Sequence, residues 1–398
     1  MQTILSRLRH LFTRKELVAV FVMVFIADVV TGIFSPTFSL YAAGLGASLT
    51  LIGLLSSIVG LTRILSSVPI GVISDVKGRK GVLVAGMFFL AVSSFLYTVV
   101  RHPSWLVPIR VLTGLAVSST FFIGIAYVGD VVDKAHRGVA IGVYTTCMGL
   151  GFTLGSGLGG EMAAALGYDI TFRLAAAAAL LGVAVAWWGL GVSPKREVSH
   201  APVLSFSTRL GLLVREPHLF AASLGNLLVI LMFDAAIVNF FPLYAASLFI
   251  SQAVIGSMFA IRALMSTLVR LPTGVLTARV SSRTLMVVAL FLGMVMIFAI
   301  CCLNDPVALT VALAGEGVCF GMFLTAGQAF VAEHFAGSER GAALGVYGTT
   351  GSIGSTAGPV VLGAVADLWG LRAVFWFTGA VVLVGIAVLL VMSYRRRA

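Results

Sequence analysis

Seven ionisable side chains lie within long apolar stretches of the sequence. They are three acids and four arginines: Asp28, Asp234, Glu316, Arg63, Arg110, Arg262 and Arg270. An ionised group is costly in apolar surroundings, so such residues usually pair or line a polar path. Because burial disfavours the charged form of a carboxyl group, the three acids are candidates for reversible proton binding. The other interpretation is that each acid forms a buried ion pair that only orders the fold.

The arginines suit a second chemistry. Arg63, Arg110 and Arg262 can each bind an anionic group of a small molecule, and the first two can also favour ionisation of a nearby acid or form structural pairs. The sequence contains an internal repeat in which Leu313 corresponds to Arg110, and Glu316 lies one helical turn beyond Leu313. This relation favours a pair between Arg110 and Glu316. Arg270 stands near the end of its apolar stretch, where we expect it to extend towards the membrane surface.

The stretches that hold these residues predict a membrane protein. Of 398 residues, 59% are hydrophobic and 10% charged, and the mean hydropathy is +1.08, which excludes a soluble globule of this size. Apolar runs of about 20 residues recur, each long enough to cross about 30 Å of hydrocarbon as a helix. We predict twelve helices, at 17–41, 48–73, 81–100, 104–129, 138–166, 171–191, 218–246, 252–277, 284–303, 307–332, 341–366 and 373–393.

The net charge of +11 marks sidedness and does not indicate a nucleic-acid partner. Of the 26 Lys and Arg, nineteen fall at one set of helix ends, four lie inside the helices, and Arg101, Arg173 and Arg372 fall at the opposite ends. Cytoplasmic loops carry the excess of basic residues, so both termini and the long middle loop are predicted to be cytoplasmic. We expect a multi-pass protein of the inner cell membrane, in contact with membrane lipids.

The sequence also repeats itself at an offset of 203 residues. The segment from Arg137 to Tyr144 matches Arg340 to Tyr347, and Asp130 falls on Glu333. An offset held without gaps indicates duplication of a six-helix unit. We therefore predict an all-α fold of two pseudo-symmetric six-helix bundles, with domains at 1–191 and 218–398 and a cytoplasmic linker at 192–217.

A loop after the second predicted helix identifies a family resemblance. The segment 71–81, Gly-Val-Ile-Ser-Asp-Val-Lys-Gly-Arg-Lys-Gly, resembles the cytoplasmic loop motif of the major facilitator superfamily, and helix number and duplication agree along the whole chain. The segment 60–71 is similar to the second helix of the efflux-type branch, which includes drug:proton antiporters. That branch often carries Gly-Pro in the fifth helix; here Gly358-Pro359 stands in the eleventh and Gly155-Ser156 in the fifth.

The resemblance assigns roles to several residues. It implies that helices 1, 4, 7 and 10 line a central cavity, and each of them carries one intramembrane charge. A cytoplasmic latch is expected from Gly71, Asp75, Gly78, Arg79, Asp130 and Arg137, in which the loop charges pair in one state and separate in the other. Close helix approach at the seam formed by helices 2, 5, 8 and 11 is expected at Gly151, Gly155, Gly159, Gly358 and Pro359.

We therefore expect a secondary transporter that moves a small amphipathic solute by alternating access, in the direction of export. Asp28 is the first candidate for proton coupling, with Asp234 or Glu316 as a further proton-binding residue. The alternatives are an organic anion carrier whose arginines bind the substrate, and, in another class, a lipid scramblase or a non-transporting membrane receptor.

An enzyme is not expected, because the sequence has no catalytic triad, metal cluster or nucleotide loop. A mid-helix GxGxxG at 155–160 follows no strand, so it does not predict a dinucleotide site. No cofactor or metal is expected, and the protein is expected to be a monomer.

Overall fold

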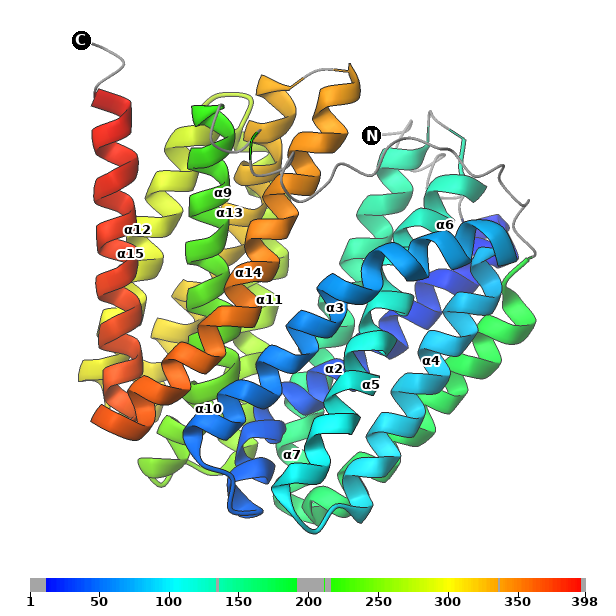
Figure 1. Cartoon of the computed structure of the whole chain (residues 1–398), viewed down its shortest axis with the longest axis horizontal. Coiled ribbons are helices and arrows are strands. Elements are labelled where there is room, and N and C mark those ends of the chain that lie inside the picture. The colour runs from blue at the N-terminus through cyan, green and yellow to red at the C-terminus, as the bar shows by residue number, and fades with distance from the viewer. Residues whose placement is uncertain (1–11, 134–135, 192–210, 212–215, 336, 395–398) are drawn as a thin grey trace. The chain divides into compact units, whose positions relative to one another are not determined.

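A computed structural model of the chain describes residues 12–133, 136–191, 211, 216–335 and 337–394. These residues form helices joined by short connections, with no strand among them (Figure 1). The first half contains α2 (Lys15–Gly44), α3 (Leu49–Lys77), α4 (Arg79–Leu96), α5 (Leu106–Val117), α6 (Ile123–Val131) and α7 (Arg137–Gly189). The second contains α9 (Pro217–Ile230), α10 (Asn239–Ser247), α11 (Gln252–Leu276), α12 (Ser282–Cys302), α13 (Pro306–His334), α14 (Gly337–Trp369) and α15 (Leu371–Tyr394).

Two of the membrane crossings contain π-helical turns. The segment η3 (Ser118–Phe122) joins α5 to α6 in one continuous crossing, and η4 (Leu231–Val238) joins α9 to α10. Pro242 follows η4 by one turn, and a proline ring clashes with the carbonyl four residues earlier. A local widening of the helix is a known way to accommodate such a break, and it is frequent at functional sites.

The twelve predicted crossings are confirmed, including the division between those at 138–166 and 171–191. Ten helices in the described part of the chain are long and apolar enough to span a membrane. One of them, α7, contains two predicted crossings, because Gly167 adopts a positive φ of 77° that turns the chain between them. The 33-residue α14 supplies the remaining crossing.

The chain forms two compact units, as the duplication predicts. One comprises Met1–Tyr41 with Ile58–His200, and the other Ala42–Ser57 with Ala201–Ala398. The first turns of α3 thus pack with the second unit, which the sequence did not indicate. The proposed domain boundaries stay a prediction, and most of the expected linker at 192–217 lies outside the described residues.

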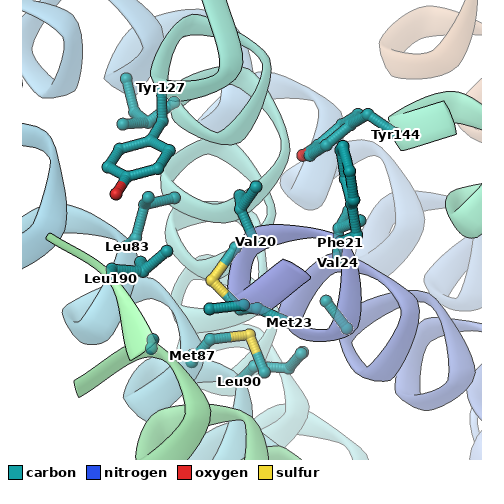
Figure 2. Packing of buried hydrophobic residues seen from close by; sticks show 14 of the residues in the cluster. Val20, Phe21, Met23, Val24, Leu83, Met87, Leu90, Tyr127, Tyr144 and Leu190 are labelled. Atoms are coloured by element: carbon teal, nitrogen blue, oxygen red, sulfur yellow. The ribbon is translucent and has the colours of Figure 1, made fainter. Parts of the chain in front are cut away.

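Each bundle has its own packed interior. In the first, Val20 and Met23 of α2 meet Leu83 and Met87 of α4, while Tyr127 closes one end of the cluster (Figure 2). Without a hydrophobic driving force between helices in lipid, such close van der Waals packing is a main source of association. The bundle interior therefore sets the positions of the buried polar groups.

The duplication extends to side-chain packing. The hydroxyl of Tyr144 lies against Gly124, where a Cβ would collide with it. Tyr347 lies against Gly327 in the same way, and both residues of this second pair are 203 positions later than those of the first. The two bundles are thus built on the same contacts between corresponding helices.

Candidate functional site

The most deeply buried charges are Arg262 of α11 and Glu316 of α13. Arg262 Nε donates to Glu316 Oε2 at 2.5 Å, and the two side chains are only 2% and 1% exposed. Gly317 makes this approach possible, because a Cβ there would collide with the backbone carbonyl of Arg262. A small residue thus brings two helix backbones together and places the ion pair at their contact.

Two aromatic rings complete the surroundings of Arg262. Its guanidinium carbon lies 3.8 Å from the ring centroid of Phe233 and 5.0 Å from that of Phe320. The two rings also contact each other, with centroids 4.4 Å apart. Both rings stabilise the guanidinium by cation–π interaction, which is stronger when the cation is removed from water.

The pair leaves hydrogen-bonding capacity unused. Arg262 Nη2 and Glu316 Oε1 are buried and have no hydrogen-bond partner among the residues that the structure describes. Leaving a buried donor or acceptor unsatisfied costs about 1–3 kcal/mol, and more for a charged group. This arrangement favours a site that a proton or a polar ligand completes.

This geometry corrects the expected pairing of Glu316. The sequence favoured Arg110 as its partner, whereas the structure pairs it with Arg262 inside the second bundle. The guanidinium of Arg110 instead lies over the ring of Phe38, 3.1 Å from its centroid. Arg63 approaches Phe122 in the same bundle at 5.7 Å.

Asp234 lies in the π-helical segment η4. Its backbone carbonyl accepts a hydrogen bond from Asn239 Nδ2 at 2.5 Å, and Asn239 Oδ1 accepts one from the hydroxyl of Ser56. Asn239 is 4% exposed. The sequence did not single out Asn239 or Ser56, although an amide five residues after an intramembrane acid indicates a polar contact.

Asp28 of α2 is also buried, at 7% exposure, and its Oδ1 accepts from the hydroxyl of Thr31 at 2.9 Å. Gly151 of α7 faces it, since a Cβ at Gly151 would lie 3.1 Å from the Asp28 Cβ. The close helix contact therefore extends to the acid itself.

Of the five residues expected at the seam, the four glycines contact other helices of their own unit, and Pro359 contacts the second helix, α3. Gly151, Gly155 and Gly159 contact the backbone of α2 within the first bundle, because a Cβ at each would collide with a carbonyl of that helix. Gly358 contacts Ala235 of η4 within the second unit. The carbonyl of Pro359 lies where a Cβ on Gly53 would stand, and both residues belong to the second unit.

Three of the predicted latch residues come together at one end of the first bundle. Arg79 Nε pairs with Asp130 Oδ2, and Arg79 Nη2 lies 3.4 Å from Asp75 Oδ1. Gly78, with a φ of 94°, makes the turn that starts α4. Arg137 donates to the carbonyl of Gly129 at 2.5 Å, while a Cβ on Gly71 would meet no atom within 4 Å.

The second bundle keeps the geometry of this contact without its positive charge. Ser282 and Glu333 stand 203 residues after Arg79 and Asp130, and the Ser282 hydroxyl donates to Glu333 Oε1 at 2.7 Å. At the opposite end of that unit, Asp367 accepts hydrogen bonds from the backbone N–H groups of Leu49 and Thr50, at 3.1 and 2.8 Å. Asp367 thus caps the start of α3, a contact that the sequence did not indicate.

The chain belongs to the Major Facilitator Superfamily, whose model matches residues 20–249 and 222–398. It is 24% identical over 369 residues to an uncharacterized MFS-type transporter of Methanocaldococcus jannaschii, covering 92% of this chain and 94% of the relative. Multidrug resistance protein 2 of Bacillus subtilis is 22% identical over 382 residues, 94% of each chain. These relatives confirm the resemblance to the efflux-type branch.

A solved structure confirms the fold. The crystal structure of a mutant of the nucleoside transporter NupG superposes with a TM-score of 0.82 at 17% identity, covering 94% of this chain and 99% of the other. The chain is therefore a multi-pass membrane transporter for small molecules, and it belongs to a family of transporters rather than of enzymes.

Proposed function

We propose that the protein is a proton-coupled exporter of a small amphipathic solute, working by alternating access. It acts as a monomer in the inner cell membrane, with both termini in the cytoplasm. The observation that carries the proposal is the buried pair of Arg262 and Glu316, in which each partner keeps one unsatisfied polar atom. The multidrug resistance proteins among its relatives support the direction of export.

The chemistry follows from the pair. A proton on Glu316 neutralises its charge and removes the ionic part of its attraction for Arg262. The guanidinium then becomes available to a polar group of the solute, while Phe233 and Phe320 offer apolar faces to its body. Proton binding and solute binding are thereby linked through one side chain. Asp28 and Asp234 are further proton-binding candidates in helices that the family resemblance places at the cavity.

The cytoplasmic contact supports alternating access. Arg79 with Asp75 and Asp130 forms a charged cluster that has to separate if the helix ends move apart. Such a cluster stabilises one state by a few charge-assisted hydrogen bonds and is lost in the other, which is the requirement for a two-state switch.

A second candidate function is transport of an organic anion. The observation that favours it is the position of Arg110, whose guanidinium lies against the ring of Phe38 and is thereby oriented. An oriented guanidinium suits a carboxylate or phosphate better than a flexible ammonium does. In this case Arg63, Arg110 and Arg262 bind the substrate.

Transport assays in proteoliposomes with an imposed pH gradient test both candidate functions, proton-coupled export and organic anion transport. The solutes are a panel of amphipathic dyes and organic anions, and a trapped pH-sensitive dye reports protons. Export by proton exchange predicts that a dye moves protons and that Glu316→Gln reduces this coupled flux at least tenfold, whereas Asp169→Asn, which alters an exposed pair, does not. Equal coupled fluxes in wild type, Glu316→Gln, Asp28→Asn and Asp234→Asn would contradict the proposal.

Three other outcomes identify the alternatives. Anion uptake that disappears in Arg110→Gln and persists in Arg173→Gln, with no dye transport, identifies the anion carrier. Movement of headgroup-labelled lipid without any gradient identifies a scramblase. Solute binding without movement of solute, lipid or protons identifies a receptor.

A further inference from the structure

The helices α9, α12, α13 and α15 are neighbours in the second bundle (Figure 1). Side chains from all four line a groove where they meet. Its volume of about 50 Å³ is several times the 10–15 Å³ that one water needs. Apolar side chains of α12 and α15 form most of its wall, and one cation stands among them. These lining residues are Arg283, Met286, Val287, Leu290, Leu389 and Leu390.

Arg283 is the one cationic side chain among the described residues that line the groove. It lies in the first turn of α12 and is exposed. No carboxylate among the described residues forms an ion pair with it, and the neighbouring Glu333 accepts its hydrogen bond from Ser282 instead. The start of a helix adds a partial positive charge at the same place. The mouth of the groove is therefore suited to an anion.

The faces around the groove indicate where that anion comes from. The most apolar windows of α12 and α15 have mean hydropathies of 2.9 and 2.7, the two highest among the described crossings. Large side chains such as Phe291 and Leu292 of α12, and Leu383 of α15, point outward and are exposed. In a membrane such faces lie against the hydrocarbon, so a ligand that fills the groove from this side is a lipid.

We propose that the groove binds an anionic phospholipid from the leaflet at this end of the bundle. One acyl chain packs against Val287, Leu290 and Leu389, and the phosphate lies at Arg283. Basic pockets between helices at the cytoplasmic surface are suited to anionic headgroups. A zwitterionic lipid brings the same acyl chain, but its ammonium group offsets the attraction to Arg283. The proposal is independent of the transported solute.

Native mass spectrometry of the full chain in detergent tests this. Phosphatidylglycerol and phosphatidylcholine with identical acyl chains are titrated separately, and the lipid-bound fraction gives each Kd. Wild type is expected to bind phosphatidylglycerol about tenfold more tightly. Arg283→Gln is expected to remove that preference, and Val287→Phe, which fills the groove, to weaken binding of both lipids. Arg279→Gln is the matched control, because Arg279 is an exposed arginine four residues earlier that does not line the groove.

Several results would overturn the proposal. One is equal affinity of the wild type for the two lipids. Another is a loss of the preference for phosphatidylglycerol in Arg279→Gln as large as that in Arg283→Gln, because this would mean that charge acts without a specific site. Full competition by inorganic phosphate at millimolar concentration would mean a phosphate site without an acyl chain. Unfolding temperatures of the variants without added lipid verify their folding, and if Val287→Phe does not fold, the Arg283→Gln comparison still decides.

Discussion

Arg262 and Glu316 form an ion pair at 2.5 Å that is almost wholly removed from solvent and packed against the rings of Phe233 and Phe320. Desolvating two charges costs several kcal/mol each, so such a pair contributes little net stability, while loss of one partner leaves an uncompensated buried charge. The pair is therefore a sensitive point in the fold, and its partners are strongly coupled.

Replacing one residue of this pair is expected to destabilise the fold far more than replacing both. Arg262→Met or Glu316→Met should lower the free energy of unfolding by about 3–5 kcal/mol, whereas the double variant should be close to wild type or above it. Denaturant unfolding in detergent measures this. Asp169→Asn, which breaks an exposed pair with Arg173, should cost less than about 1 kcal/mol.

The double variant also separates stability from transport. If the pair serves coupling, the stable double variant still lacks proton-driven flux. A double variant that folds and couples normally would show that the pair only orders the bundle, which is the structural interpretation of these charges.

The contacts of Arg79 and Ser282 at corresponding places of the two bundles give a prediction with an internal control. Arg79→Gln removes the ion pair with Asp130, whereas Ser282→Ala removes the neutral donor at the corresponding contact in the other bundle. Charge-assisted hydrogen bonds contribute about 1.5–3 kcal/mol and neutral donors about 0.5–1.5. Transport by Arg79→Gln should therefore fall about tenfold with unchanged solute affinity, and transport by Ser282→Ala should fall less than threefold. Equal losses in flux assays would contradict a latch that depends on charge.

Much of the fold could be predicted because helix length and apolar composition are local properties. The expected crossing at 252–277 corresponds to α11 at Gln252–Leu276, and that at 284–303 to α12 at Ser282–Cys302. The break between the crossings at 138–166 and 171–191 was also predicted, and Gly167, with its positive φ, forms it within α7.

The site was only partly predictable. The sequence singled out both Arg262 and Glu316 as intramembrane charges, but which charges meet depends on how two helices are rotated against each other. Gly317 fixes that rotation through its contact with the Arg262 backbone, and one sequence does not reveal which helix a glycine faces. The same limit applies to Gly151, Gly155 and Gly159, which were expected at the seam and lie against α2 in the structure.

Asp367 provides a prediction about pH. It lies just beyond the predicted crossing at 341–366; burial alone would raise its pKa, but hydrogen bonds from Thr50 and Leu49 outweigh this and lower the pKa below 3.8. A carboxyl group with a lowered folded-state pKa stabilises the fold at pH values above its unfolded pKa, and this stabilisation is lost as pH falls through the folded pKa. The contact should therefore be complete at neutral pH and be lost only below pH 3.8.

Hydrogen exchange measures this contact directly. Asp367→Ala removes the cap of α3, and a lost cap costs about 1 kcal/mol, or about fivefold in opening. The amides of Leu49 and Thr50 should exchange about fivefold faster at neutral pH, and the difference from wild type should vanish below the pKa of Asp367. Asp305→Ala, which removes the cap of α13, should leave these two amides unchanged. A difference that persists unchanged at the lowest pH would show that the carboxylate charge is not involved.

Gly155 and Gly142 of α7 give the last prediction, in which one substitution has opposite effects at two sites on a helix. A Cβ at Gly155 would collide with the backbone of Val29, whereas a Cβ at Gly142 meets nothing within 4 Å. Gly155→Ala should lower the free energy of unfolding by about 1–3 kcal/mol, because two backbones must move apart. Gly142→Ala should raise it by up to about 1 kcal/mol, because alanine loses less backbone entropy in a helix. Denaturant unfolding of the two variants side by side measures both, and destabilisation by Gly142→Ala as large as that by Gly155→Ala would contradict the role of α2 contact. Because Gly151, next along the same face, lies against Asp28, Gly155→Ala should also reduce any proton flux that depends on Asp28.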